Sequence, residues 1–230
     1  MDPKSPLNIR SLKEQVYEFL REQLRKGELR PGAVIDMEKT SKRLGVSKTP
    51  LRDALLQLEY EGFVSILPRR KIVVNPLTLP DIRNYYEIIG ALESVAVLTA
   101  VDNLKDADLK RLEALNAEMR EAVEKDDFDL YYDRNLKFHD VYLGTSGNAI
   151  LHKIINTMKK RLYDFPRPLK FVREWELVSI DEHSELIQLL KRRNREEAGA
   201  FIRDIHWSYS VQEKFIARYY AGAAGADADR

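Results

Sequence analysis

The chain contains four histidines and no cysteine, so its nitrogen and sulfur ligands for a transition metal are few. Asn135 and His139 are four residues apart on one predicted helix and share a face of it. His183 and His206 fall on the last two predicted helices, where a turn near Arg193 allows them to face each other. Three imidazoles with one oxygen ligand would hold a divalent ion such as Zn, Ni, Mn or Fe. The alternative is four ordinary histidines, since the spacing gives no tight ligand motif.

Residues 47–59 predict a helix whose first turn is built to contact DNA. Ser47 follows the turn at Gly45 and is placed to cap this helix by accepting a hydrogen bond from a free backbone N–H. Pro50 falls in the first turn, where its missing N–H costs little. Apolar residues form one stripe, and polar residues project from the N-terminal end on the opposite side. The stripe contains Leu51, Leu55 and Leu58, and the polar group contains Lys48, Thr49 and Arg52.

Neighbouring segments complete a helix-turn-helix with a wing. Residues 37–44 predict the companion helix, and its glycine-containing link to the next helix is short. Residues 11–26 have apolar side chains at helical spacing and predict a third helix. The runs 63–67 and 72–75 are rich in β-branched residues and predict a hairpin. Its tip carries three consecutive cations, Arg69, Arg70 and Lys71.

The near-neutral total charge hides an uneven distribution along the chain. Residues 1–76 contain 15 Lys/Arg and 10 Asp/Glu, a net +5, which leaves −4 for residues 77–230 because the whole chain is +1. For any single basic residue, a solvated surface charge is the better interpretation. The helix-turn-helix, the wing and the basic N-terminal third together favour phosphate contact and hence DNA binding.

The remainder of the chain predicts helices. Two prolines interrupt the pattern near residues 75–80, and beyond them apolar residues recur at three- and four-residue spacing in six segments with short links. These segments are 81–101, 105–125, 128–143, 149–163, 171–192 and 196–220. We therefore expect a mainly α protein. Its parts would be a winged helix-turn-helix over residues 1–76, an antiparallel all-α bundle for effector binding and dimerisation over 77–220, and a disordered tail over 221–230.

Composition narrows the protein class. Without cysteine there is no disulfide framework and no thiol chemistry. The first residues lack an apolar signal core, and no run approaches the ~18 apolar residues of a membrane span. We therefore expect a cytoplasmic protein that makes no membrane contact.

Residues 10–75 resemble the winged helix-turn-helix of GntR-type transcription regulators. The residues that carry the resemblance are 29–32, 45–55, 58–59 and 61–64. The resemblance implies that Ser47, Lys48, Thr49 and Arg52 contact DNA. Lys48 stands where arginine is commoner in the family, and Lys71 stands where a wing-tip glycine is usual, so base preference and the wing contact are expected to differ.

Residues 77–220 resemble the FCD effector domain of the FadR subfamily, through residues 135–139, 146–148 and 182–183 and a last helix bearing His206. In metal-binding members, residues at the places of Asn135, His139, His183 and His206 hold one divalent ion. The interval from His183 to His206 is one residue longer than expected. An extra residue in the turn 192–194 would leave His206 in the site, whereas one within the helix would rotate it out by about 100°. His152 matches no family role and is interpreted as structural.

The resemblance also raises a question about the effector. An arginine often stands four residues before the glutamate that Glu93 represents, and this chain has Ile89 there. Such an arginine could bind a small carboxylate. Arg161 lies on an otherwise apolar helix and is our candidate effector-binding residue, the alternative being a surface arginine with a buried stem.

These observations predict a ligand-responsive transcription regulator. A homodimer would place two recognition helices on a palindromic double-stranded DNA operator, and a small-molecule effector in the bundle would alter operator affinity. Repression relieved by the effector is the default, with activation as the alternative. The competing classes are a metal-dependent enzyme fused to a DNA-binding module and a purely architectural DNA binder. Against the enzyme, the sequence contains no His-Glu-x-x-His motif. An architectural DNA binder would not need a histidine-lined cavity.

Overall fold

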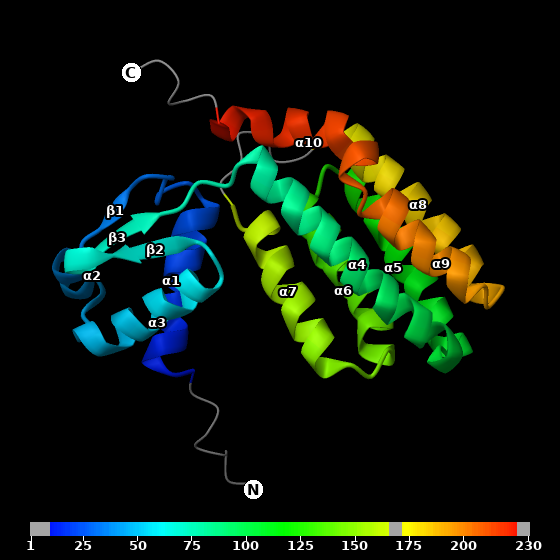
Figure 1. Cartoon of the computed structure of the whole chain (residues 1–230), viewed down its shortest axis with the longest axis horizontal. Coiled ribbons are helices and arrows are strands. Elements are labelled where there is room, and N and C mark those ends of the chain that lie inside the picture. Colours follow the sequence, from blue (N-terminus) through cyan, green and yellow to red (C-terminus); the bar gives the residue numbers. More distant parts are fainter. Residues whose placement is uncertain (1–9, 166–171, 225–230) are drawn as a thin grey trace, which may run out of the picture. The chain divides into compact units, whose positions relative to one another are not determined.

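The computed structural model describes residues 10–165 and 172–224 (Figure 1). The chain divides into two compact units, the first formed by Met1–Leu77 with Lys160–Pro166 and the second by Thr78–Lys159 with Arg167–Arg230. Among the described residues, no helix is both long and apolar enough to cross a bilayer.

The first unit is a winged helix-turn-helix, as the sequence predicts. Its sheet has the order β1-β3-β2 with antiparallel neighbours, and Leu67 pairs with Lys71 at the wing. The short strand β1 was missed by the sequence analysis, because its pairing with β3 is non-local and no periodicity marks a strand of two residues. The elements are α1 (Leu12–Arg25), β1 (Val34–Ile35), α2 (Met37–Leu44), α3 (Lys48–Tyr60), β2 (Val64–Leu67) and β3 (Lys71–Val74).

Local signals explain where these helices begin and end. Ser11 and Glu14 form a reciprocal capping box at the start of α1. Asp36 caps α2 by accepting hydrogen bonds from two backbone N–H groups, and Gly45 ends α2 with a left-handed φ of 65°. The apolar stripe of α3 then packs on α1 and the sheet, and Leu51, Leu55 and Leu58 are fully buried there. The opposite face of α3 is thereby left exposed.

The second unit is an all-helical bundle, which confirms the predicted fold class (Figure 1). The first five helices, α4 to α8, begin and end within a few residues of the predicted bounds. They are α4 (Leu79–Asn103), α5 (Asp106–Glu124), α6 (Phe128–Thr145), α7 (Ala149–Tyr163), α8 (Arg173–Lys191), α9 (Arg195–Phe201) and α10 (Tyr209–Ala224).

The last predicted helix, 196–220, is wrong in two respects. A π-helical turn, Ile202–His206, follows α9. The helix is then interrupted at Trp207 and Ser208, and α10 begins after them. At the other end, α10 extends to Ala224, because the alanine-rich start of the predicted tail favours helix. Residues 225–230 of that tail, and residue 171 at the predicted start of α8, lie outside the described residues.

The end of α7 belongs to the winged unit. Arg161 Nη2 donates to the carbonyl oxygen of Pro76 at 2.7 Å, and Arg21 Nε donates to Asp164 Oδ2 at 2.5 Å. The Arg161 guanidinium also lies 5.1 Å from the centroid of the Phe63 ring. These contacts explain why residues 160–166 group with the N-terminal unit, a division that no break in the sequence pattern indicated.

Candidate metal centre and DNA-binding surface

Three histidines converge inside the helical unit. His139 comes from α6, His183 from α8 and His206 from the π turn, and one ring nitrogen of each lies within 4.8 Å of the others. The ring centroids are 4.9 to 5.4 Å apart. His139 and His183 are 1% and 0% exposed. The structure thus brings together the histidines that the sequence nominated, from three separate elements.

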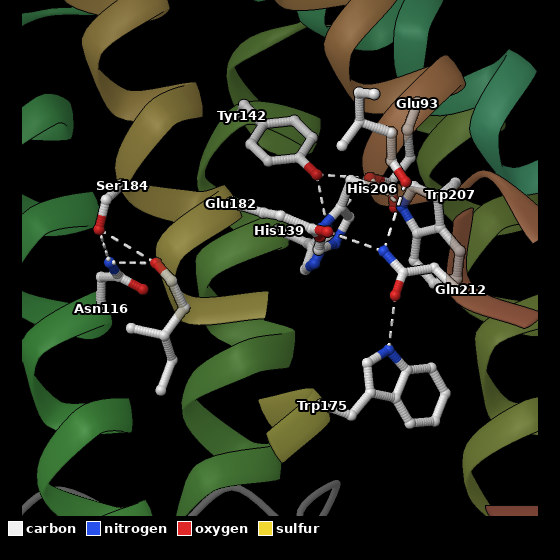
Figure 2. Close-up of polar contacts among 12 residues, drawn as sticks. Glu93, Asn116, His139, Tyr142, Trp175, Glu182, Ser184, His206, Trp207 and Gln212 are labelled. Atoms are coloured by element: carbon white, nitrogen blue, oxygen red, sulfur yellow. Dashed lines mark hydrogen bonds and ion pairs between the residues drawn. The ribbon is translucent and has the colours of Figure 1, made fainter. Parts of the chain in front are cut away.

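Two of these rings are oriented by carboxylates (Figure 2). The Nδ1 atom of His139 lies 2.9 Å from Glu93 Oε2, and that of His206 lies 2.7 Å from Glu182 Oε2. An Nδ1–H that donates to a carboxylate leaves Nε2 with its lone pair free, which is how metal-binding histidines are usually held. The Nε2 atom of His139 is buried and has no hydrogen-bond partner among the described residues.

Further buried polar atoms near these rings are also unpaired. Within the described part of the chain, both ring nitrogens of His183 and Oδ1 of Asn135 have no hydrogen-bond partner. Asn135 is 6% exposed and lies one turn before His139 on α6. A buried polar atom without a partner costs about 1–3 kcal/mol, and a group of such atoms in one place fits a ligand-binding site. A cation bound by the three imidazoles would satisfy one nitrogen of each ring.

The protonation states suit a metal ligand. Burial lowers the pKa of His139 to about 4. Burial, together with the neighbouring histidines His206 and His139, holds the pKa of His183 well below its ordinary value. Both rings are therefore neutral at pH 7, which is the form that binds a metal.

The π turn brings His206 into the site. The Trp207 N–H donates to the Ile202 carbonyl at 2.9 Å, five residues back, so this turn takes up one more residue than an α turn. The sequence analysis left open whether an extra residue in the helix would rotate His206 out of the site. The wider turn contains His206, and this ring lies beside those of His139 and His183.

Close packing of α4 on the π turn supports this geometry. A Cβ atom on Gly90 of α4 would lie only 2.9 Å from Cβ of Trp207. The Trp207 indole Nε1–H donates to Glu93 Oε2 at 3.0 Å, and the Tyr142 hydroxyl also donates to this oxygen. Gly90 therefore allows the close approach that places Trp207, and with it His206, beside Glu93.

The second oxygen of Glu93 faces a buried lysine. Lys159 of α7 forms an ion pair with Glu93 Oε1, and its Nζ lies 5.2 Å from the centroid of the Trp207 ring. Burial alone would raise the pKa of Glu93, but the adjacent His139 and Lys159 hold it well below its usual range. The sequence analysis did not nominate Lys159 or Glu182. A lysine within the apolar stripe of α7 was the available signal for the first.

Glu182 is itself held in place. Gln212 of α10 is 2% exposed, and its Nε2 donates to Glu182 Oε1 at 2.7 Å. Its Oε1 accepts from Trp175 Nε1 at 2.9 Å (Figure 2). A chain of hydrogen bonds therefore runs from α10 through α8 to the His206 ring.

The predicted DNA-contacting residues of α3 lie on its exposed face. Ser47, Lys48, Thr49 and Arg52 are all exposed. The predicted capping role of Ser47 is wrong. Ser47 occupies the N-cap position, yet its hydroxyl makes no capping hydrogen bond among the described residues. The third residue after it is Pro50, which has no N–H to donate.

The wing places further cations next to α3. Arg69 and Lys71 are exposed at its tip, where Pro68–Arg70 form a short 3-10 turn; Arg70 belongs to the same turn. The left-handed residue is Arg69, with φ 62°, whereas Lys71 is extended. A lysine at the usual glycine position therefore requires no strain. A groove of about 550 Å³ between α3 and the sheet is lined by Lys48, Arg52 and Lys71 among others, which brings the two predicted sets together.

Arg161 does not join the histidine cluster. It is 3% exposed, and its guanidinium donates to the carbonyl oxygens of Asn75 and Pro76 in the winged unit. Our expectation of a buried arginine agrees with this position, but its partners differ from those expected of an effector ligand. The helical stripe indicated burial and could not indicate that this end of α7 belongs to the winged unit.

Comparisons with known proteins agree with the two units. Residues 12–74 match the family described as bacterial regulatory proteins, gntR family, and residues 84–206 match the FCD domain. The HTH-type transcriptional regulator McbR of Escherichia coli (strain K12) is 31% identical over 81% of this chain and 85% of its own length. The chain belongs to the GntR family of transcription regulators.

Two further similarities support the assignment. The uncharacterized HTH-type transcriptional regulator YdhC of Bacillus subtilis (strain 168) is 28% identical over 80% of this chain and 83% of its own length. The solved structure of E. coli McbR/YncC superposes with a TM-score of 0.69 at 27% identity, covering 93% of this chain and 99% of that chain. This GntR regulator is therefore a DNA-binding protein and not an enzyme, and its family binds operators as dimers.

Proposed function

We propose that this regulator is a metal-dependent, ligand-responsive repressor that acts in the bacterial cytoplasm. The observation that carries the proposal is the buried histidine triad, two of whose rings are already oriented by Glu93 and Glu182. In a helical unit with only a structural role, several buried nitrogens without hydrogen-bond partners at one point would be a cost with no compensation.

To bind DNA, the protein would use two sets of residues in the winged unit. Ser47, Lys48, Thr49 and Arg52 would enter the major groove with α3, and the wing residues Arg69, Arg70 and Lys71 would contact phosphate or the minor groove. A homodimer on a palindromic operator would double these contacts.

The sensing end would hold one divalent ion through His139, His183 and His206, with Asn135 as an oxygen ligand. Such an ion supplies a Lewis-acidic centre for an effector. Three imidazoles favour Zn, Ni or Fe over Ca or Mg, and the neutral carbonyl of Asn135 contributes less charge than a carboxylate would. An effector bound there would bias the placement of the winged units and release the operator.

The test combines metal content with operator binding. Purified wild-type protein, stripped with a chelator and reloaded with zinc, is expected to retain one zinc per chain. His183→Ala is expected to lose it, whereas His152→Ala is a matched control on a half-buried ring paired with Asp140 outside the triad. Fluorescence anisotropy with DNA from upstream of its own gene reports operator binding. Equal zinc content in wild type and His183→Ala would overturn the metal site, and indifference to DNA sequence would overturn the regulator mechanism.

A further inference from the structure

A further groove lies on the helical unit between α5 and α8. It has a volume of about 430 Å³. The described residues that line this α5–α8 groove include no histidine of the triad. Figure 2 shows Asn116 and Ser184 apart from His139 and His206. The lining includes Glu113, Asn116, Arg120, Glu121 and Glu124 of α5 and Ser184 of α8.

Asn116 is a polar residue within the buried stripe of α5. Leu112 and Met119, one turn to either side, are fully buried, and Asn116 itself is 7% exposed. Its Nδ2 donates to the carbonyl oxygen of Ile180 at 3.0 Å and to Ser184 Oγ at 2.9 Å (Figure 2). Because a carbonyl oxygen can only accept, these bonds fix which end of the amide faces α8.

The other end of this amide is not satisfied. Oδ1 of Asn116 is buried and has no hydrogen-bond partner among the described residues. Ser184 cannot provide a donor, since its one hydroxyl proton is donated to the Ile180 carbonyl oxygen at 3.0 Å. A buried acceptor without a donor is costly. A groove lined by such a residue therefore fits a ligand that carries an N–H or O–H donor.

Acidic side chains outnumber basic ones along the groove. Glu113, Glu121 and Glu124 lie on α5, and Arg120 is the one cation among the described lining residues. The Arg120 guanidinium already has a partner, because its Nη2 donates to Asp181 Oδ1 at 2.6 Å. Arg120 therefore does not neutralise the glutamates, and the groove favours a cation.

Glu124 is the carboxylate most open to such a cation. Glu113 forms an ion pair with Lys191, and Glu121 forms one with Lys125. Glu124 is exposed, and its carboxylate has no ion pair with any residue in the described part of the chain. Ion pairs between exposed side chains are weak and screened by salt, so a ligand cation can also replace Lys125 or Lys191.

The spacing of these groups fits an elongated ligand. Glu113 and Glu124 are eleven residues apart on α5, which is about 16 Å along the helix axis. Asn116 lies between them, one turn after Glu113. Ala117 and Ile187 add apolar surface to the groove. Amines separated by short methylene chains would match this series of acceptors and apolar contacts.

We propose that the α5–α8 groove binds a linear aliphatic polyamine, with one ammonium group donating to Asn116 Oδ1 and the others paired with the glutamates of α5. The ammonium groups supply both the donor and the positive charge, and the methylene chains lie against Ala117 and Ile187. This site is independent of the proposed metal site, because the two share no residue.

The first test compares ligands on the full-length wild-type protein. Isothermal titration calorimetry at low ionic strength measures the binding of spermidine. Magnesium chloride offers positive charge without a chain, and triethylene glycol offers a chain without charge. Spermidine alone is expected to bind, and its affinity should fall as salt is added. No binding of spermidine, or equal binding of magnesium or of the glycol, would overturn the proposal.

The second test locates the spermidine site. Glu124→Gln removes the unpaired carboxylate, and Ala117→Arg places a cation at an exposed position of the groove. Glu185→Gln removes an exposed carboxylate of α8 outside the groove. We expect the first two variants to bind spermidine at least about fivefold more weakly and the third to bind it as wild type does. Equal affinities in all three variants would overturn the location.

The third test assigns the hydrogen bond to Asn116. Asn116→Leu removes Oδ1 at similar volume, whereas Ser184→Ala removes a partner of Nδ2 and keeps Oδ1. Spermidine binding is expected to weaken at least about fivefold in Asn116→Leu and to stay unchanged in Ser184→Ala. Undiminished binding by Asn116→Leu would overturn the role of Oδ1. If that variant does not fold, undiminished binding by Ala117→Arg decides against the site.

Discussion

The Nδ1 atom of His206 lies 2.7 Å from Oε2 of Glu182, whose other oxygen accepts a hydrogen bond from the buried Gln212. Because a carboxylate partner fixes the tautomer and orientation of a metal-binding ring, Glu182→Gln should lower zinc affinity about 10- to 100-fold. Competition with a fluorescent chelator measures this affinity. Glu185→Gln, an exposed change on the same helix, is the control. Equal affinities in the two variants would show that Glu182 does not orient the ring.

Gly90→Ala should disturb the site without touching a ligand. The added Cβ would lie 2.9 Å from Cβ of Trp207, which is the root of a side chain and cannot swing aside. We expect a loss of about 1–3 kcal/mol in the free energy of unfolding, together with weaker zinc binding.

The control for Gly90→Ala is Gly144→Ala. Gly144 lies in α6 with no atom within 4 Å of its added Cβ. Greater helix propensity should leave its unfolding free energy unchanged or raise it by about 1 kcal/mol. Urea denaturation of both variants gives the comparison. Similar stability for the two would mean that α4 and the π turn can separate at no cost.

Arg52→Ala should weaken operator binding while leaving the fold intact. Arg52 is exposed on α3, so its removal creates no cavity. Losing one base or phosphate contact of this kind costs about 1–3 kcal/mol, or roughly 5- to 150-fold in affinity. Lys110→Ala, an exposed charge on α5, should bind as wild type does. Anisotropy titrations with both variants measure the operator affinity. If Arg52→Ala bound the operator as tightly as wild type, α3 would not be the helix that recognises DNA.

The metal-free protein should lose stability on mild acidification. The pKa of His139 is about 4 in the folded chain and about 6.5 when unfolded, so the unfolded chain binds more protons between these values. The contribution of His139 is present above pH ~6.5 and is lost as the pH falls toward ~4, by about 3 kcal/mol for this ring alone.

Urea denaturation in the presence of a chelator, from pH 8 to 4, measures this loss. His139→Gln has no imidazole at that position and should show a shallower decline. A midpoint for wild type that stays constant from pH 6.5 to 5 would mean that the buried ring carries a charge in the folded protein.

Most of the secondary structure follows from local pattern. The stripe of Leu51, Leu55 and Leu58 and the β-branched runs of the wing predict their elements, because each buries one face. Features set by non-local contacts were not predictable. The strand β1 exists only through pairing with β3, and the π turn before Trp207 depends on packing against Gly90.

The residues of the candidate metal site also include some that the sequence predicted and some that it did not. His139, His183 and His206 were nominated from helical spacing and from a family resemblance. Glu182 and Lys159 were missed, because their partners are 24 and 66 residues away along the chain. Position on a helix stripe indicates burial, but only the tertiary fold shows which carboxylate a buried ring or ammonium faces.

The return of residues 160–166 to the winged unit has a practical consequence for protein engineering. A DNA-binding fragment cut after residue 77 would lack Asp164, the buried partner of Arg21 Nε, and would lack Arg161 on the Asn75 and Pro76 carbonyls. The part of the winged unit that residues 160–166 cover would then be exposed to solvent. Chimeric sensors built from this chain should therefore graft a discontinuous module, in which the N-terminal segment travels with the last turn of α7.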